Sequence, residues 1–190
     1  APSLVGSEMC IRDRNMGIFV YKNSIEPEFC ERLIKLYKDH KDTPLLLKED
    51  YGHLYNVKCN YIQTQFFPEI DNELVKVVHK ILIRAMQDNP HLCCSEDSGY
   101  VLREIYGKTR LHIDSVLDPN KPTKGRTIAI IIALNSDYEG GIFNFPLQNY
   151  KVKLKQGDAI IFPATYTHPH EVSSPENGTL RYTINTWMFA

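Results

Sequence analysis

The stretch Arg110-Leu111-His112-Ile113-Asp114 sets a histidine and a carboxylate two positions apart in a segment that we predict to be a β-strand. Side chains at alternate positions of a strand point to the same side, so His112 and Asp114 can reach one metal ion. Another histidine, His170, follows much later in the segment Pro169-His170-Glu171-Val172. Two histidines and a carboxylate on one face of an octahedral ion leave the other face open, which is typical of non-haem Fe(II) centres. For all three to bind one ion, the fold must bring two distant strands side by side.

Around this stretch, the second half of the chain predicts a mainly β fold. Short segments rich in β-branched and aromatic residues alternate with turns from about residue 98 onward. The expected strands cover residues 100–106, 110–114, 127–134, 141–145, 150–154, 159–162, 168–173 and 181–188. This spacing favours a double-stranded β-helix, that is, a cupin-like jelly roll, with its core at about residues 98–190.

Two N-terminal α-helices are expected to pack outside the jelly roll. The first follows a capping signal at residues 23–24 and a proline in its first turn, Pro27, and it should end near His40. The second should run from about Glu69 to Gln87, because apolar residues recur there at helical spacing. Between the helices, residues 54–67 are aromatic and β-branched and indicate a strand pair or an extended segment.

The first residues differ in character from the rest. Residues 4–14, LVGSEMCIRDR, resemble the in-frame translation of a transposase-type sequencing adapter, so we expect residues 1–15 to be a non-native or disordered leader. No positively charged start precedes an apolar stretch, so the segment does not resemble a signal peptide. An ordinary flexible tail is the alternative and would change nothing downstream. Residues 16–190 are then expected to form a single domain.

Composition narrows the classes of partner. The net charge is -1, and Lys and Arg do not cluster, so nucleic acid is not expected as a partner. No apolar run approaches the length that spans a bilayer, so no membrane association is expected. The 5 cysteines show no CxxC spacing and indicate a reducing compartment, so we expect a cytoplasmic protein of a bacterium or a virus-infected host cell. The oligomeric state stays open.

The last expected strand carries an unusual inner face. Alternation over residues 181–187 puts Arg181, Thr183, Asn185 and Trp187 on one side, which we predict to face the core. Burying a guanidinium without a partner is unfavourable. A dicarboxylate ligand would supply the partner, because arginine forms a planar bidentate pair with a carboxylate.

Taken in order, these motifs resemble the Fe(II)/2-oxoglutarate dioxygenases, in particular their prolyl 4-hydroxylase-like branch, over about residues 100–189. The matching pieces are Ile105-Tyr106-Gly107, His112-Ile113-Asp114, Ala133-Leu134-Asn135, Tyr138-Glu139-Gly140-Gly141, Gly157-Asp158, Pro169-His170-Glu171-Val172 and Arg181-Tyr182 with Trp187. The resemblance implies Fe(II), 2-oxoglutarate and O2 as cofactors and cosubstrates, with ascorbate as a further expected ligand.

The resemblance also implies a role for each matching residue. The implied metal ligands, which are also catalytic residues, are His112, Asp114 and His170. The implied cofactor contacts are Arg181 at the distal carboxylate of 2-oxoglutarate, Tyr106, Thr183 and, lining the pocket near the iron, Trp187. The catalytic set includes Arg181 as well. His168 and the arginines at positions 103, 110 and 126 are weaker candidates, which we expect to serve in packing or solvation.

The implied activity is a hydroxylase that inserts oxygen into a C–H bond and releases succinate and CO2. Its expected substrate is a prolyl residue in a peptide or protein. Two alternatives stay open: a hydroxylase of a free amino acid or other small metabolite, and a non-catalytic cupin-like metal-binding module.

Two features of the sequence leave questions about cosubstrate and substrate binding. Animal prolyl hydroxylases of the branch carry a tyrosine where Ala133 stands, so another residue must support Arg181. The polar, proline-rich loop at 115–125 follows two of the expected ligands and is a candidate lid over the substrate.

Overall fold

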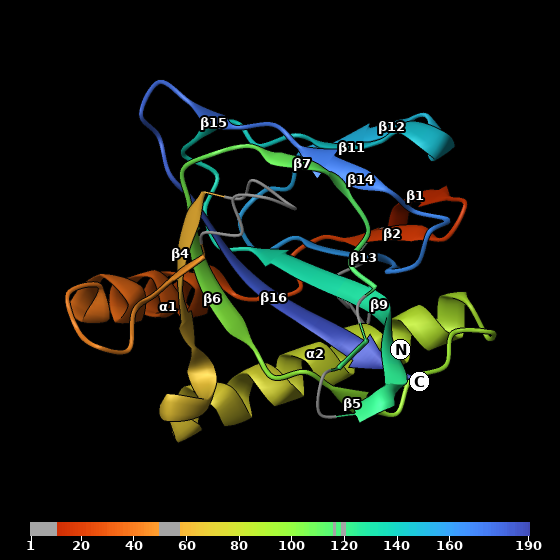
Figure 1. Ribbon diagram of the computed structural model, residues 1–190, viewed down its shortest axis with the longest axis horizontal. Coiled ribbons are helices and arrows are strands. Elements are labelled where there is room, and N and C mark those ends of the chain that lie inside the picture. The colour runs from red at the N-terminus through yellow and green to blue at the C-terminus, as the bar shows by residue number, and fades with distance from the viewer. Residues whose placement is uncertain (1–10, 50–57, 116, 119–120) are drawn as a thin grey trace, which may run out of the picture.

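The protein is described by a computed structural model that covers residues 11–49, 58–115, 117–118 and 121–190 (Figure 1). In these ranges the helices are α1 (Pro27–His40), α2 (Pro68–Asp88) and the short 3-10 turns η1 (Thr64–Phe66) and η2 (Pro146–Gln148). The strands are β1 (Ile11–Asn15), β2 (Ile18–Tyr21), β3 (Leu47–Glu49), β4 (Cys59–Gln63), β5 (Glu96–Asp97), β6 (Val101–Ile105), β7 (Thr109–His112), β8 (Leu117–Asp118), β9 (Lys121–Ala133), β10 (Glu139–Gly140), β11 (Phe143–Phe145), β12 (Tyr150–Val152), β13 (Ala159–Pro163), β14 (His170–Val172), β15 (Pro175–Glu176) and β16 (Arg181–Phe189).

Two antiparallel sheets face each other and form the body of the molecule. The larger sheet has the order β1-β2-β13-β9-β16-β6-β4-β3, and the smaller has the order β12-β11-β14-β7. Strand β16 lies at the centre of the larger sheet between β9 and β6. From β6 onward the chain passes repeatedly between the two sheets, as the jelly-roll prediction requires.

The space between the sheets is filled by one of the two main apolar clusters. It joins Phe143 and Phe145 of the smaller sheet to Ile131, Phe162 and Trp187 of the larger one. Along β9 and β16, the residues next to Ile131 and Trp187 point to the opposite face of the larger sheet, because side chains alternate across a strand. The inner face of β16 is therefore the face that carries Trp187, and it looks toward the smaller sheet.

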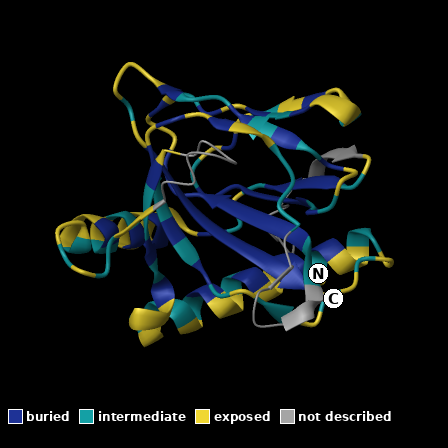
Figure 2. Ribbon diagram, in the orientation of Figure 1, coloured by how far each residue is buried: buried dark blue, intermediate teal, exposed yellow. Residues whose placement is uncertain are grey.

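The other main cluster lies on the outer face of the larger sheet, where the two long helices pack. Leu33 of α1 and Leu74 and Ile81 of α2 belong to one cluster with Ile130 and Ile184 of the sheet. Figure 2 shows the central strands buried, while each helix turns an exposed stripe outward. Full burial of one such side chain contributes roughly 2 kcal/mol, so this face anchors the sheet that carries β16.

Most element predictions agree with the structure, and the differences have physical reasons. The first helix begins at Pro27 with Glu26 before it and no side-chain cap, because the Ser24 hydroxyl donates to the Tyr21 carbonyl instead. Strand β7 ends at His112, so Asp114 lies just past the strand expected to contain it. Strand β4 lies within the expected extended segment of residues 54–67, of which residues 54–57 are outside the described part.

Parts of the expected leader and lid fall outside the described residues. Residues 11–15 of the expected leader form β1, which pairs with β2. Residues 1–10 are not described, and a non-native origin stays a prediction. In the candidate lid, β8 pairs with the start of β9, while residues 116 and 119–120 are not described.

Two further observations bear on the class of protein. Among the described helices, none is long and apolar enough to cross a membrane. Among the described residues, the cysteines at positions 30, 59, 93 and 94 form no disulfide bond.

Candidate active site

The two expected histidine ligands are direct neighbours across a strand pair. His112 of β7 and His170 of β14 are partners in the antiparallel register, and their ring centroids lie 4.3 Å apart. The register shifts between this pair and the next one, Val172 with Thr109, so β7 carries an extra residue just before His112. Such a bulge bends a strand and re-aims its side chains. The distant strands that the sequence required to meet are therefore adjacent.

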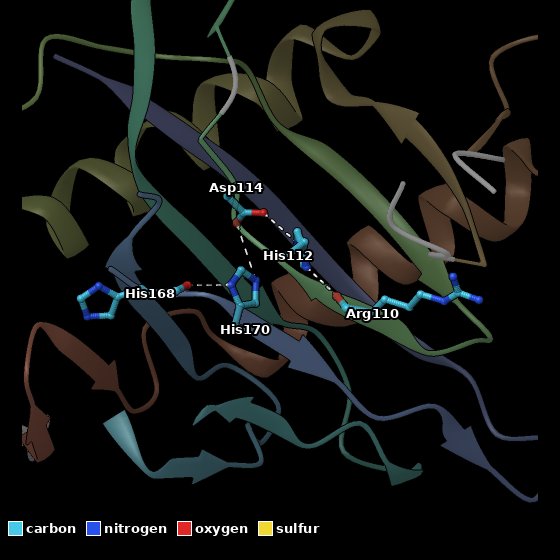
Figure 3. Close-up of polar contacts among 5 residues, drawn as sticks. All are labelled: Arg110, His112, Asp114, His168 and His170. Carbon is cyan, nitrogen blue, oxygen red and sulfur yellow. Dashed lines mark hydrogen bonds and ion pairs between the residues drawn. The ribbon is translucent and has the colours of Figure 1, made fainter. Parts of the chain in front are cut away.

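Asp114 completes a three-residue cluster. Its Oδ1 lies 3.1 Å from Nε2 of His112, and its Oδ2 lies 3.9 Å from Nε2 of His170. One ligand atom from each residue falls within 4.8 Å of the others, which is close enough for all three to bind one ion. Figure 3 shows the two imidazoles and the carboxylate converging on the same point.

The backbone fixes which nitrogen each histidine presents. Nδ1 of His112 lies 2.8 Å from the carbonyl oxygen of Arg110, and Nδ1 of His170 lies 3.3 Å from that of His168. A carbonyl oxygen can only accept, so each Nδ1 carries the proton and donates it. The Nε2 atoms of both rings then face Asp114 and are the atoms that would bind a metal ion, which is the arrangement that metal-binding histidines adopt.

The cluster is shielded from water, and this burial affects the pKa values of its residues. The rings of Phe145 and Phe162 pack on His170, whose side chain is 2% exposed. Burial lowers the pKa of His170 to about 4, so this imidazole is neutral and ready to bind a metal at neutral pH. Burial opposes the charge of Asp114, but its hydrogen bond with His112 and the electrostatic attraction of His170 and His112 together outweigh burial and hold the pKa of the carboxyl well below its usual range.

Arg181 lies on the inner face of β16, as predicted, and it is buried. The side chain is 4% exposed, its Nε has no hydrogen-bond partner, and no carboxylate among the described residues pairs with it. Its guanidinium lies over the Phe143 ring, 5.3 Å from the centroid. Burial, and then the positive charge of Arg103, lower the pKa of Arg181 to about 10. A buried cation in this state is stabilised by an anion that supplies its missing acceptor.

Thr183 and Trp187 lie on the inner face of β16 with Arg181, whereas Tyr106 lies in an exposed position after β6. Thr183 is buried and donates a hydrogen bond of 2.7 Å to Oδ1 of Asn185. Trp187 is 7% exposed and lies in the cluster between the sheets. Tyr106 follows β6 and is 45% exposed. The structure therefore brings two of these three candidate contacts to the inner face, and the role of Tyr106 stays a prediction.

Tyr138 is a neighbour of Arg181 to which the sequence had assigned no role. Gly141 allows their approach: a Cβ built there would lie 2.5 Å from the Tyr138 ring and 3.2 Å from Cδ of Arg181. The Tyr138 hydroxyl donates to the Leu154 carbonyl at 3.2 Å, so the ring is held in place. The position of the tyrosine before two turn glycines was the only available signal. Ala133, the position at which animal prolyl hydroxylases of the branch carry a tyrosine, pairs with Thr183 of the neighbouring strand.

His168 is turned away from the cluster. Its Nε2 lies 2.8 Å from the Met16 carbonyl and its Nδ1 lies 2.9 Å from the Thr167 hydroxyl, so both nitrogens have partners outside the metal cluster. Figure 3 shows its ring pointing away from His170. Its contribution to the site is the carbonyl oxygen that orients His170, in agreement with the expected packing role.

Comparison with known proteins identifies the family. The sequence model of the 2OG-Fe(II) oxygenase superfamily, where 2OG is 2-oxoglutarate, matches residues 101–189. The jelly-roll region of this chain belongs to that superfamily. The match spans His112, Asp114, His170 and Arg181, and it covers the region in which the sequence motifs were found. No curated protein sequence matches the chain.

Solved structures of prolyl hydroxylases share the 2OG-Fe(II) oxygenase fold of this chain. The viral collagen prolyl hydroxylase of Paramecium bursaria Chlorella virus-1, in complex with 2OG, is 17% identical with a TM-score of 0.66, over 91% of this chain and 96% of that one. A Trichoplax adhaerens prolyl hydroxylase in complex with a peptide of hypoxia inducible factor is 16% identical with a TM-score of 0.71, over 93% and 84%. A Pseudomonas putida prolyl-4-hydroxylase is 16% identical with a TM-score of 0.65, over 90% and 91%. At this identity the likeness bears on the fold and not on the substrate.

Proposed function

We propose that the protein is an Fe(II)- and 2-oxoglutarate-dependent hydroxylase that inserts oxygen into a C–H bond. The observation that carries this proposal is Arg181, a buried guanidinium without an acidic partner among the described residues, on the inner face of the same sandwich that holds the three-residue cluster. A metal alone would explain His112, Asp114 and His170. A dicarboxylate cosubstrate also explains the arginine.

The residues present fit both Fe(II) and 2-oxoglutarate. Two imidazole Nε2 atoms and one carboxylate suit Fe(II), and they would hold it through His112, His170 and Asp114. Arg181 would hold the distal carboxylate of 2-oxoglutarate through its fork of N–H donors, with Thr183 beside it. When bound, the metal and cosubstrate would supply the oxidising chemistry: one oxygen atom of O2 would enter succinate as 2-oxoglutarate loses CO2, and the other would become the hydroxyl of the product.

The chain's own contribution is orientation and exclusion of water. The carbonyl oxygens of Arg110 and His168 fix both imidazoles before the metal arrives, so little reorganisation is needed. The aromatic rings at positions 143, 145 and 162 keep this side of the site dry, which strengthens every electrostatic contact within it.

For the substrate we propose a prolyl residue in a peptide or protein. The support is the fold shared with three prolyl hydroxylases, one of them in complex with a peptide. Fold likeness alone supports a substrate weakly, because specificity lies in side chains and loops. Hydroxylation of a free amino acid or other small metabolite is therefore the second candidate. Ascorbate as a ligand stays a prediction.

The test is succinate formation from 2-oxoglutarate with Fe(II), ascorbate and O2, together with a gain of one oxygen in proline-containing peptides by mass spectrometry. We expect turnover by the wild type and none by His170→Ala or Arg181→Ala. His79→Ala is the matched control, because His79 is an exposed residue of α2, and it should keep full activity.

Two results would count against the proposal. Metal binding without any succinate, across peptides and small metabolites, would favour the non-catalytic metal-binding module. Succinate formation that survives Arg181→Ala with an unchanged KM for 2-oxoglutarate would show that the arginine does not bind the cosubstrate.

A further inference from the structure

A row of aromatic rings connects Arg181 to the metal cluster. The guanidinium carbon of Arg181 lies 5.3 Å from the centroid of the Phe143 ring. The Phe143 and Phe145 rings stack with their centroids 6.5 Å apart, and the Phe145 ring stacks on that of His170 at 5.4 Å. Both phenylalanines are buried in β11, and side chains packed in a core have little freedom to move. The row therefore holds the arginine at a set distance from the metal ligands.

Among the described residues, none makes a polar contact that fixes the direction of the Arg181 guanidinium. Its Nε has no hydrogen-bond partner, and no described residue forms an ion pair with it. An arginine has several rotatable bonds, so ordering a loose one on binding weakens affinity by roughly two- to tenfold. Before a ligand binds, the orientation of Arg181 thus depends on the side chains that pack against it.

Tyr138 packs against the stem of this arginine. Gly141 lies beside both: a Cβ built there would be 2.5 Å from the Tyr138 ring and 3.2 Å from Cδ of Arg181. The tyrosine is itself held at three points. Its hydroxyl donates to the Leu154 carbonyl at 3.2 Å, the Lys153 ammonium donates to its carbonyl oxygen at 2.6 Å, and the same ammonium lies 4.7 Å from the ring centroid. Tyr138 is therefore a rigid surface against which the arginine stem lies.

We propose that Tyr138 is a positioning residue. Together with Phe143 it fixes the guanidinium of Arg181, and the set distance from Arg181 to the metal ligands selects the chain length of the dicarboxylate cosubstrate. The inference rests on the proposed function, because it concerns the cosubstrate of that same site. Relative to 2-oxoglutarate, oxaloacetate has one methylene fewer between its 2-oxo carbon and its distal carboxylate, and 2-oxoadipate has one more. A rigid site distinguishes ligands that differ by one methylene by roughly ten- to two-hundredfold.

Calorimetric titration of the Zn(II)-loaded protein with these three dicarboxylates measures the preference for chain length. We expect the wild type to bind 2-oxoglutarate roughly tenfold or more tightly than either of the other two. Tyr138→Met fills most of the volume of the ring with a flexible side chain. In this variant the Kd of 2-oxoglutarate should rise roughly two- to tenfold, and the preference should fall to about threefold or less, because Arg181 can shift to follow a shorter or longer ligand. Tyr138→Phe keeps the ring and should retain most of the preference.

Tyr100→Met is the matched control. Tyr100 is 3% exposed, as against 4% for Tyr138, and its hydroxyl donates to Oδ2 of Asp97 at 2.8 Å. It belongs to the apolar cluster on the helix side of the larger sheet, so its replacement removes a buried tyrosine on the face away from Arg181. Its preference for chain length should equal that of the wild type, whatever its loss of stability. Circular dichroism and melting temperature show whether each variant folds, and Tyr138→Leu replaces Tyr138→Met if the latter does not fold.

The Nε–H group of Arg181 gives a readout that needs neither metal nor cosubstrate. Its signal in the NMR spectrum of the arginine side chains is the one that Arg181→Met lacks. Relaxation of the Nε nucleus reports how far the side chain moves on the picosecond to nanosecond timescale. We expect this group to be well ordered in the wild type, in Tyr138→Phe and in Tyr100→Met, and clearly more mobile in Tyr138→Met.

Turnover should separate a positioning role from a general loss of structure. With 2-oxoglutarate as cosubstrate, Tyr138→Met should raise the KM by about the same factor as the Kd and leave kcat within about twofold, because the variant alters binding of the cosubstrate and not the metal ligands.

These measurements distinguish the possible failures. A wild type that binds all three dicarboxylates equally, a preference that survives in folded Tyr138→Met, or an Arg181 Nε–H group that stays equally ordered there would overturn the positioning role and leave the hydroxylase standing. A preference that depends on Tyr138 in binding, without succinate formation on any substrate, would support the positioning role and overturn the hydroxylase proposal. Failure of all three dicarboxylates to bind the Zn(II)-loaded wild type would overturn both.

Discussion

Replacing Arg181 with methionine should make the ligand-free protein more stable, although it removes a residue that we assign to cosubstrate binding. Burial lowers the pKa of Arg181 to about 10. At about 1.36 kcal/mol for each pKa unit, the folded state disfavours the charged guanidinium by roughly 3 kcal/mol. Loss of the cation–π contact with Phe143 offsets about 1 kcal/mol of this. Methionine keeps an unbranched apolar stem in the same space, so we expect a net gain of about 2 kcal/mol.

The order of stability should reverse when 2-oxoglutarate is added. A ligand at one hundred times its Kd stabilises the folded protein by about 2.7 kcal/mol, and the variant should gain none of it. Urea denaturation of both Zn(II)-loaded proteins, with and without 2-oxoglutarate, measures each of the four free energies of unfolding. Arg84→Met is the control, because it removes a stacked arginine outside the site. It should show the same response to 2-oxoglutarate as the wild type.

The reasoning would be refuted if Arg181→Met were less stable than the wild type without ligand. That result would mean that other groups already compensate the buried charge, so the guanidinium would not require an anion. Equal stabilisation of both proteins by 2-oxoglutarate would refute the assigned contact separately.

Three further results are expected from the same geometry. First, burial lowers the pKa of His170 to about 4 from an ordinary 6.5, so the unfolded chain binds the extra proton between these values and stability falls as pH drops through this window. In urea titrations of metal-free protein, His170→Gln should flatten that fall by about 3 kcal/mol. Second, Gly178→Ala should lower the free energy of unfolding by about 1–2 kcal/mol, because φ is +71 there although the new Cβ meets open space. Gly141→Ala, at φ +65, also brings the Cβ into the Tyr138 ring, so thermal melts should show a loss at least about 1 kcal/mol larger. Third, Zn(II) should raise the melting temperature of the wild type, and Asp114→Ala should lose this increase.

The sequence predicted the elements of the fold well because its periodicities are local. Alternation over residues 181–187 assigned the inner and outer faces of β16 correctly, and the buried Arg181 is the result. Helix spacing placed the end of α1 at His40, where the structure has it. The capping signal was wrong because the residue before the helix is Glu26, while Ser24 lies two positions earlier and donates to the Tyr21 carbonyl.

The contacts between distant segments could not be predicted in the same way. The carbonyl of Arg110 orients His112, and no pattern of residue types encodes a backbone acceptor. Arg103 and Arg126 looked like ordinary strand and loop charges, because stacking on Trp187 appears only when three strands are side by side. Tyr106 matched a motif by sequence, yet its exposure depends on how the chain leaves β6.

The extra residue in β7 has a consequence for how the chain tolerates change in length. His112 meets His170 only because the strand register changes between Thr109 and His112. Inserting one more residue there would place a neighbouring side chain, and not the imidazole, opposite His170, and would end metal binding without altering any ligand. The turn at Gly178 imposes no such constraint, since a Cβ there meets nothing within 4 Å. Engineering of new segments should therefore begin at that turn and leave the β7 edge at its present length.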